Sequence, residues 1–270
     1  MASPAAYAAI TVRAAAAAQV FVDDPAQPVL AEEDQHHLGR VLRLRAGQEV
    51  VASDGYGRWA RTVWRGETNA VLELLHDGTG PGGDGTVQTE ARPEPLLTVV
   101  FAPVKGERPE WVVQKLTELG IDRIVPLRTE RSVVRWSGAR GRATVERLRR
   151  VAREAAAQSR RVWLPEVAET IGFEELSTLG DPGDVVLAQL SGDRPTAAQR
   201  VVAVGPEGGW SVTELAAGLP TVGFGLSVLR AETAAVTAGA LLASLRTGTV
   251  AQAQAQAQAQ SSDRAESSHP

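Results

Sequence analysis

The chain contains no cysteine, a single methionine and few aromatic residues, which make up 4% of its 270 positions. Without cysteine no disulfide can form, and no thiolate can act as a nucleophile or a metal ligand. This composition fits a reducing compartment, and we expect a cytoplasmic protein. The sequence also lacks an uncharged apolar run of about 18 residues, the length that a membrane-spanning helix needs. We therefore expect no membrane partner.

Basic residues are scarce overall but concentrated in one segment. The formal net charge is −4, which by itself argues mildly against a nucleic-acid partner. Between residues 123 and 161, however, twelve arginines stand against three glutamates, a net charge of +9. The planar guanidinium fork suits phosphate well. The segment is therefore either a solvated charged face or a phosphate-binding surface.

Turn formers and low-complexity stretches divide the chain into five parts. Residues 1–18 are alanine-rich and predict a loose extension without the features of a signal peptide. Residues 19–76 contain short β-rich runs, with a hairpin signal at Asp54-Gly55-Tyr56-Gly57, and predict a small β-barrel. Residues 77–95 are typical of a linker. Residues 96–248 form the second domain, and the Ala-Gln-rich segment 249–270 predicts a disordered tail.

Strand and helix signals alternate in the second domain. Apolar runs at 96–101, 121–127, 184–190, 201–204 and 221–224 predict strands, and a helix is expected over 108–119 with Pro109 in its first turn. This alternation predicts an α/β fold with a mainly parallel sheet.

The segment Val201–Leu215 reads VVAVGPEGGWSVTEL and predicts a buried strand, a glycine loop and a helix start. Three glycines between 205 and 209 let the backbone approach a flat ligand. Ser211 and Glu214 have the spacing of a capping box. Because Glu207 would repel phosphate and no Gly-Lys-Ser/Thr ending follows, the loop does not fit a nucleoside triphosphate.

A second block, GFGLSVLRAETAAVTAGALL at 223–242, repeats this layout. The two blocks predict a ligand site at the carboxyl edge of a parallel sheet. The alternative is that both are only strand, turn and buried helix. A dinucleotide-binding oxidoreductase is disfavoured because Gly223 and Gly225 lack a third glycine at Val228, and GYGRWA at 55–60 is followed by a strand-like run.

Four separated motifs resemble the ribosomal RNA small subunit methyltransferase E family. They are GPEGGWS, GLSVLRAETA, KGERPEWVVQKLTELGI at 105–121 and EAAAQSRR at 154–161, and the first domain is similar through FVDDPAQP and HHLGRVLRLRAGQEV. The resemblance implies a SPOUT domain with a trefoil knot after a PUA-like domain, and a homodimer. It further implies transfer of a methyl group from S-adenosylmethionine to N3 of a uridine in 16S ribosomal RNA, free or within the small subunit. The absence of cysteine agrees, since methylation at pyrimidine carbon 5 ordinarily needs a thiolate.

The resemblance places the cofactor among three loops. The implied cofactor-binding residues are Leu187, Ala188, Gln189, Leu190, Val204, Gly205, Pro206, Glu207, Gly208, Gly209, Gly223, Phe224, Gly225, Ser227, Val228 and Leu229.

Loss of the N3 proton requires charge stabilisation and a proton acceptor, and Arg230 and Glu232 are the candidates for these two roles. A structural ion pair or helix cap is the alternative for Glu232. The residues predicted to contact RNA are His36, His37, Arg43, Arg45, Lys105, Arg131, Arg135, Gln158, Arg160 and Arg161. His36 and His37 could equally lie on a polar surface, and their adjacency is not a metal-ligand spacing. We expect no metal.

Three positions depart from the family pattern. Trp210 stands where the family usually has Phe or Leu, Ser227 where it usually has Arg, and Arg160 where it usually has Gly. Two other functions remain open: a SPOUT enzyme that methylates a ribose 2′-oxygen, and a non-catalytic module that binds ribosomal RNA during assembly.

Overall fold

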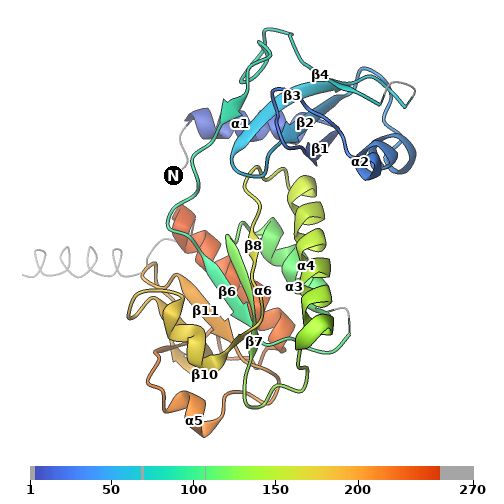
Figure 1. The fold of residues 1–270 in the computed structure, drawn as a ribbon. Helices are drawn as coiled ribbons and strands as arrows, with labels where there is room; N and C mark the ends of the chain where they lie inside the picture. The colour runs from blue at the N-terminus through green and yellow to red at the C-terminus, as the bar shows by residue number, and fades with distance from the viewer. Residues whose placement is uncertain (1–3, 68–69, 107, 250–270) are drawn as a thin grey trace, which may run out of the picture.

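The computed structural model describes residues 4–67, 70–106 and 108–249. Figure 1 shows two domains, a smaller one built around a β-sheet and a larger α/β domain below it. The predicted tail 249–270 lies outside the described residues apart from Thr249.

The smaller domain contains one five-stranded sheet with the order β1-β2-β3-β4, and β5 pairs with β3. β1 runs parallel to β2, and the other pairs are antiparallel. The predicted hairpin joins β2 to β3, where the Asp54 carboxylate accepts hydrogen bonds from the backbone N–H groups of Tyr56 (2.7 Å) and Arg58 (3.1 Å). Its elements are α1 (Pro4–Ala15), β1 (Ala18–Phe21), α2 (Glu32–His36), a π-helix (His37–Val41), β2 (Glu49–Ser53), β3 (Arg58–Trp64), β4 (Leu72–Leu74) and β5 (Gln88–Thr89).

The amino-terminal segment is a helix, so the prediction of a loose extension over residues 1–18 is wrong for the part that is described. Helix α1 packs through Ala9 and Val12 against Val51 and Trp59 of the sheet, and Ala16, which follows the helix, joins the same cluster. Alanine favours helix, and its small side chain allows close approach of the helix to the sheet. Arg13, which interrupts the alanine-rich run, is 4% exposed and lies over the Trp59 ring.

The glycine-rich segment 77–89 belongs to the smaller domain, which corrects the predicted linker of residues 77–95. Arg61 of β3 forms ion pairs with Glu49 (2.7 Å) and Asp77 (3.1 Å) and donates to the carbonyl of Thr79. The bonds to Glu49 and Asp77 raise the pKa of Arg61, with the Glu49 hydrogen bond as the largest cause. Composition indicates turns here but does not show that a buried guanidinium from another strand holds them.

The larger domain has a seven-stranded sheet in which every pairing is parallel, with the order β12-β10-β11-β6-β7-β8 and β9 on β7. Its elements are β6 (Thr98–Phe101), α3 (Arg108–Glu118), β7 (Arg123–Arg128), α4 (Gly138–Gln158), β8 (Glu166–Val167), β9 (Ile171–Gly172), a 3-10 helix (Phe173–Thr178), β10 (Val185–Asp193), β11 (Val201–Val204), α5 (Val212–Leu215), β12 (Thr221–Val222) and α6 (Ala231–Thr247). The predicted strands and the helix at 108–119 are confirmed.

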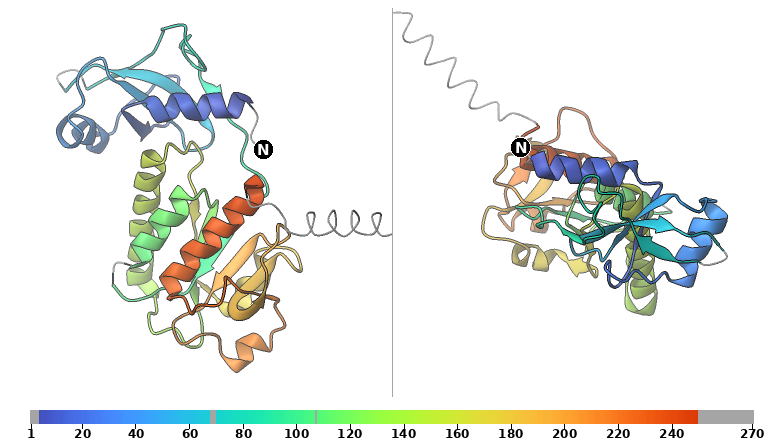
Figure 2. Two further views of the ribbon diagram at one scale, coloured as in Figure 1. Left: turned by 180° about the vertical axis from the view of Figure 1, so that it is seen from behind. Right: turned by 90° about the horizontal axis from the view of Figure 1, so that it is seen from above.

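Helices cover one face of this sheet, as seen from behind in Figure 2, where α3, α4 and α6 lie side by side. Val112, Leu116 and Leu148 pack from these helices onto Val99 and Ile124 of the strands. The other face packs against Leu176 of the 3-10 helix and Trp210. The sheet is therefore buried on both faces, which explains its continuous apolar strands.

The segment Val222–Gly223 is enclosed by the end of β10. Val222 pairs with Ala188 and again with Asp193, and the Gly223 N–H donates to the Asp193 carbonyl (2.8 Å). A Cβ on Gly223 would lie 2.9 Å from the carbonyl oxygen of Gly192 and 3.1 Å from that of Leu190. Glycine is required here because the backbone passes inside another loop.

Arginines from the end of α4 join the two domains. The Arg153 guanidinium donates to the carbonyl of Phe21 (2.8 Å) and lies 4.9 Å from its ring centroid. Arg160 donates to the carbonyl of Ala16 (2.9 Å), and Gln19 donates to the carbonyl of Arg161 (2.6 Å).

Candidate functional site

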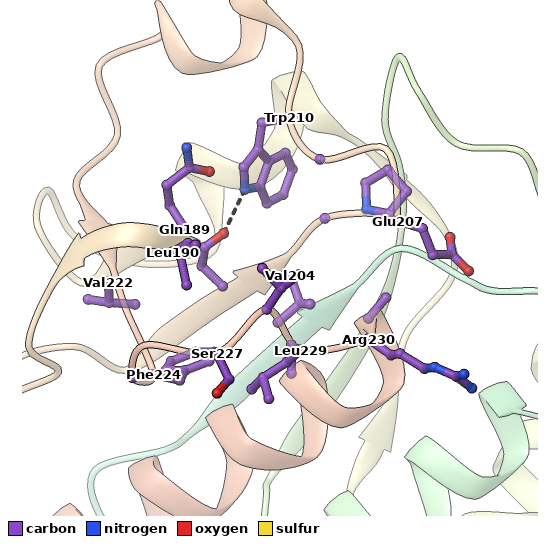
Figure 3. Close-up of a pocket in the computed structure, with 18 residues that line it drawn as sticks. Gln189, Leu190, Val204, Glu207, Trp210, Val222, Phe224, Ser227, Leu229 and Arg230 are labelled. Carbon is purple, nitrogen blue, oxygen red and sulfur yellow. Dashed lines mark hydrogen bonds between the residues drawn. The ribbon is translucent and has the colours of Figure 1, made fainter.

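A cavity of about 380 Å³ lies at the carboxyl edge of the sheet, beyond β10, β11 and β12. Three loops form it, and Figure 3 shows their side chains pointing into one space. Its lining residues are Ala188, Gln189, Leu190, Val204, Gly205, Pro206, Glu207, Gly209, Trp210, Val222, Phe224, Gly225, Ser227, Val228, Leu229, Arg230, Ala231 and Ala234. A cavity therefore lies at the edge of the sheet where the sequence predicts a ligand site.

The loop after β11 is shaped by two glycines and one tryptophan. A Cβ on Gly205 would lie 3.1 Å from the Trp210 ring, so the missing side chain lets the indole pack on the backbone. Gly209 takes a positive φ of 67°, which favours glycine. Trp210 is 4% exposed, and its Nε1–H donates to the Ala188 carbonyl (2.9 Å; Figure 3). The indole thereby ties the loop after β11 to the end of β10.

Helix α5 begins where the capping box predicted. The Ser211 hydroxyl accepts from the Glu214 N–H (3.1 Å), and the Glu214 carboxylate accepts from the Ser211 N–H (2.8 Å). This reciprocal pair fixes where the loop ends.

The third loop runs from Gly223 to the start of α6, with Arg230 as the N-cap residue. Gly225 has a φ of 127°, a conformation that L side chains rarely adopt. Val204 and Leu229 line the cavity from different elements, which gives it an apolar wall suited to a flat ring. Val228 is 85% exposed at the rim.

Most predicted cofactor residues line this cavity, and three do not. Leu187 is 1% exposed in the core on the other face of the sheet. Gly208 presents its carbonyl to the Arg131 side chain (2.9 Å), and Gly223 lies inside the β10 loop. Sequence reasoning did not assign Trp210, Val222, Ala231 and Ala234 to the lining, although Trp210 directly follows the glycine pair.

The two predicted catalytic residues are separated. Arg230 lines the cavity and is exposed, and Figure 3 shows its side chain extending on the same side as Glu207. Glu232 lies outside the lining, with its Oε1 3.4 Å from Arg108 Nη1 and its side chain 12% exposed. The structure thus shows Glu232 in the ion-pair role that was its alternative. Its Oε2 lacks a hydrogen-bond partner among the described residues.

Several predicted RNA contacts are exposed. Arg131 and Arg135 follow β7. Arg131 lies beside the loop after β11, and Arg135 lines a second cavity of about 560 Å³ together with Arg128 and Phe173. The other exposed members of the predicted set are His36, His37, Arg43, Arg45, Lys105 and Gln158.

Arg161 is a structural residue, which corrects its assignment to phosphate. Its side chain is 13% exposed, donates to the carbonyls of Thr117 (2.8 Å) and Ile121 (2.9 Å), and lies 3.7 Å from Asp122. Burial lowers the pKa of the Arg161 guanidinium to about 10, although Asp122 acts in the opposite direction. These carbonyls occupy the donors that a phosphate would need.

Arg160 is also a structural residue, and the RNA assignment is corrected for it as well. It has a φ of 58°, in the left-handed region, which gives a physical reason for the glycine that the family usually has here. Its guanidinium donates to the carbonyls of Ala157 (2.9 Å) and Ala16 (2.9 Å). The side chain thus closes α4 and contacts the smaller domain.

Two negative findings apply to residues 4–67, 70–106 and 108–249. No helix in these ranges is long and apolar enough to cross a membrane. No group of three or more His, Asp or Glu side chains there could hold a metal ion.

Two protein-family models match this chain and define its class. A family model described as an RNA methyltransferase domain matches residues 92–243, and a model described as an RNA methyltransferase PUA domain matches residues 30–63. Together with the parallel sheet and its enclosed loop, these matches confirm the predicted class, a SPOUT RNA methyltransferase with a PUA-like domain.

Two relatives carry the same name, "Ribosomal RNA small subunit methyltransferase E". The protein from Synechocystis is 34% identical over 78% of this chain and 70% of its own length. The protein from Mycobacterium bovis is 32% identical over 80% of this chain and 86% of its own length. The chain belongs to the ribosomal RNA small subunit methyltransferase E family.

Two solved structures share the fold. A probable rRNA methyltransferase from Porphyromonas gingivalis has a TM-score of 0.66 and 26% identity, and the match covers 85% of this chain and 98% of that one. A ribosomal RNA small subunit methyltransferase E from Neisseria gonorrhoeae, solved with S-adenosyl methionine, has a TM-score of 0.68 and 24% identity, covering 84% of this chain and 97% of that one.

Proposed function

We propose that this chain transfers a methyl group from S-adenosylmethionine to N3 of a uridine in 16S ribosomal RNA. The observation that carries the proposal is the cavity at the carboxyl edge of the sheet, where two glycine loops meet beside Arg230. Exposed Arg131 lies beside the loop after β11, and exposed Arg135 lies beside α5. Membership of the family supports the RNA substrate and the cofactor.

The residues of the cavity fit S-adenosylmethionine. The enclosed volume of about 380 Å³ lies within the usual range of small-molecule sites, roughly 300–1,000 Å³. Val204 and Leu229 can contact the adenine, and the glycine backbone leaves peptide groups accessible to the ribose and the methionine part. When bound, the cofactor supplies an electrophilic methyl group on a sulfonium.

The chain's own groups then handle charge and the proton. N3 lies on the Watson–Crick edge, so the uridine must be unpaired or extruded before it reaches the cavity. The proton leaves N3 as the new N–C bond forms and the S–C bond breaks. Arg230 stabilises the negative charge that develops on the uracil ring. Among the residues that line the cavity, Glu207 provides a carboxylate that can accept the proton.

The test uses small ribosomal subunits that lack the modification. They are incubated with the protein and with S-adenosylmethionine labelled in the methyl group, and the RNA is then digested to nucleosides. We expect label in 3-methyluridine. Label in a 2′-O-methylated nucleoside would establish the ribose alternative. If neither the small subunits nor naked 16S RNA receive label, the non-catalytic alternative is established.

We also propose a homodimer with the site near its interface, acting in the cytoplasm where ribosomal RNA is modified. Leu226 is fully exposed and Val228 is 85% exposed, both beside the cavity, and such residues favour a protein contact. Sedimentation velocity should give twice the 28.5 kDa mass of one chain.

A further inference from the structure

The loop after β7, residues 129–132, and the loop after β11, residues 205–211, share one buried carboxylate. Glu214 of α5 is 5% exposed. Its Oε1 accepts from the backbone N–H of Glu130 (2.8 Å), and its Oε2 accepts from that of Ser211 (2.8 Å). Glu130 follows β7, whereas Ser211 ends the loop after β11. A single side chain therefore fixes two loops that come from different strands.

A second bond joins the same loops at the surface. The Arg131 Nη1 donates to the Gly208 carbonyl (2.9 Å), one residue before the cavity-lining Gly209. Arginine carries further N–H donors, so the same guanidinium can bind a phosphate. The two ends of the 129–132 loop are joined by a buried hydrogen bond between the hydroxyls of Thr129 and Ser132, which lie 2.9 Å apart.

Glu214 also lies between two cavities. It lines the second cavity, with Arg128 and Arg135, and through Ser211 it adjoins Trp210 of the cofactor cavity. A ligand that shifts residues 129–132 on one side thus acts on the backbone that shapes the other side.

We propose that residues 129–132 couple RNA binding to cofactor binding, with Glu214 as a positioning residue and Arg131 as the side chain shared by both sites. RNA bound to this loop holds the positions of the Glu130 backbone and the Arg131 side chain, which Glu214 and Arg131 connect to residues 205–211. The arrangement of residues 205–211 that the cofactor contacts is thereby favoured, which gives positive coupling. The coupling is reciprocal, so the cofactor strengthens RNA binding by the same factor. This inference rests on the proposed function.

The experiment measures S-adenosylhomocysteine affinity by calorimetry, without RNA and with a saturating 16S RNA transcript. For the unmodified protein we expect RNA to lower the Kd about fivefold or more. In Glu214→Gln an amide N–H faces a backbone N–H, so one of the two bonds is lost and the ratio falls towards one. Arg131→Ala should lower the ratio similarly without disturbing a buried group.

Glu130→Gln is the matched control, because it removes one negative charge from the same loop while only the Glu130 backbone bonds Glu214. It should keep the full ratio. Thermal unfolding of each variant shows whether it is folded. If Glu214→Gln does not fold, the ratio measured for Arg131→Ala tests the coupling. A ratio of one in the unmodified protein, or an unchanged ratio in Arg131→Ala, overturns the coupling. Loss of the proposed function is distinct, because S-adenosylhomocysteine then fails to bind the unmodified protein at all.

Discussion

Arg230 owes its place at the cavity to the start of α6. As the N-cap residue it has an extended backbone, with φ of −64° and ψ of 153°, so its side chain departs from the helix axis at the rim. Glu232 lies two residues further on, inside the helix, and its side chain meets Arg108 instead. Residues close in sequence thus have different roles because a helix turns its side chains away from one another.

Arg230→Ala should slow methyl transfer strongly while cofactor binding stays measurable, because the proposed role of the guanidinium is to stabilise charge that develops only in the transition state. Loss of one such group costs on the order of 10²–10³ in rate. Single-turnover methylation and calorimetry with S-adenosylhomocysteine measure the two effects. Arg200→Ala, at the opposite edge of the sheet, is the control. Lost cofactor affinity with intact single-turnover transfer would contradict the assignment.

At the scale of elements, helix α1 connects the sheet of the smaller domain to the end of α4. Arg13 pairs with Glu90, donates to the Arg160 carbonyl (3.2 Å) and lies 5.1 Å from the Trp59 ring centroid. Burial lowers the pKa of the Arg13 guanidinium to about 10. The Arg13 side chain is 5% exposed and that of Glu90 26% exposed, so both belong to a largely desolvated pair.

Arg13→Met should lower the free energy of unfolding by about 3 kcal/mol, because the methionine still covers Trp59 but leaves Glu90 without its partner. Denaturant unfolding measures this change. Arg58→Met is the matched control, since the Arg58–Asp24 pair is about half exposed and should contribute less than ~1 kcal/mol. Adding Glu90→Gln to Arg13→Met should recover part of the loss. Equal effects of Arg13→Met and Arg58→Met would refute a special role for α1.

The arginine-rich segment 123–161 has two parts that differ in their contacts. Its carboxyl end, with Arg153, Arg160 and Arg161, holds the domains and the core together. Its amino-terminal part carries the exposed Arg131, beside the loop after β11, and the exposed Arg135, beside α5. A net charge of −4 is therefore compatible with RNA binding, because the local charge near the site differs from the average.

RNA affinity should fall steeply with salt, because phosphate contacts release counterions. If about four phosphates are neutralised, the affinity drops roughly 50-fold between about 50 and 200 mM salt. Filter binding at several salt concentrations gives the slope. The double variant Arg131→Gln, Arg135→Gln should reduce the slope of affinity against salt, whereas Arg200→Gln should leave that slope unchanged. A flat dependence in the unmodified protein would show that the exposed arginines do not bind phosphate.

The features that the sequence predicted correctly are those set by neighbouring residues. The strand at 201–204, the capping box of Ser211 and Glu214 and the helix at 108–119 each depend on propensity and spacing over a few positions. The glycine loops were identified for the same reason. The resemblance to the family was equally local, since it lay in short motifs.

The features that were missed depend on contacts between distant positions. Whether an arginine binds a phosphate or a carbonyl depends on which backbone lies beside it, and for Arg160 that backbone is Ala16. The enclosure of Gly223 and the packing of α1 on Trp59 likewise need the finished fold. Local patterns were enough to predict the strands of the larger domain, the glycine loops and the family. Which arginines stay exposed was settled by the fold, because burial and hydrogen bonding are properties of residues brought together by folding.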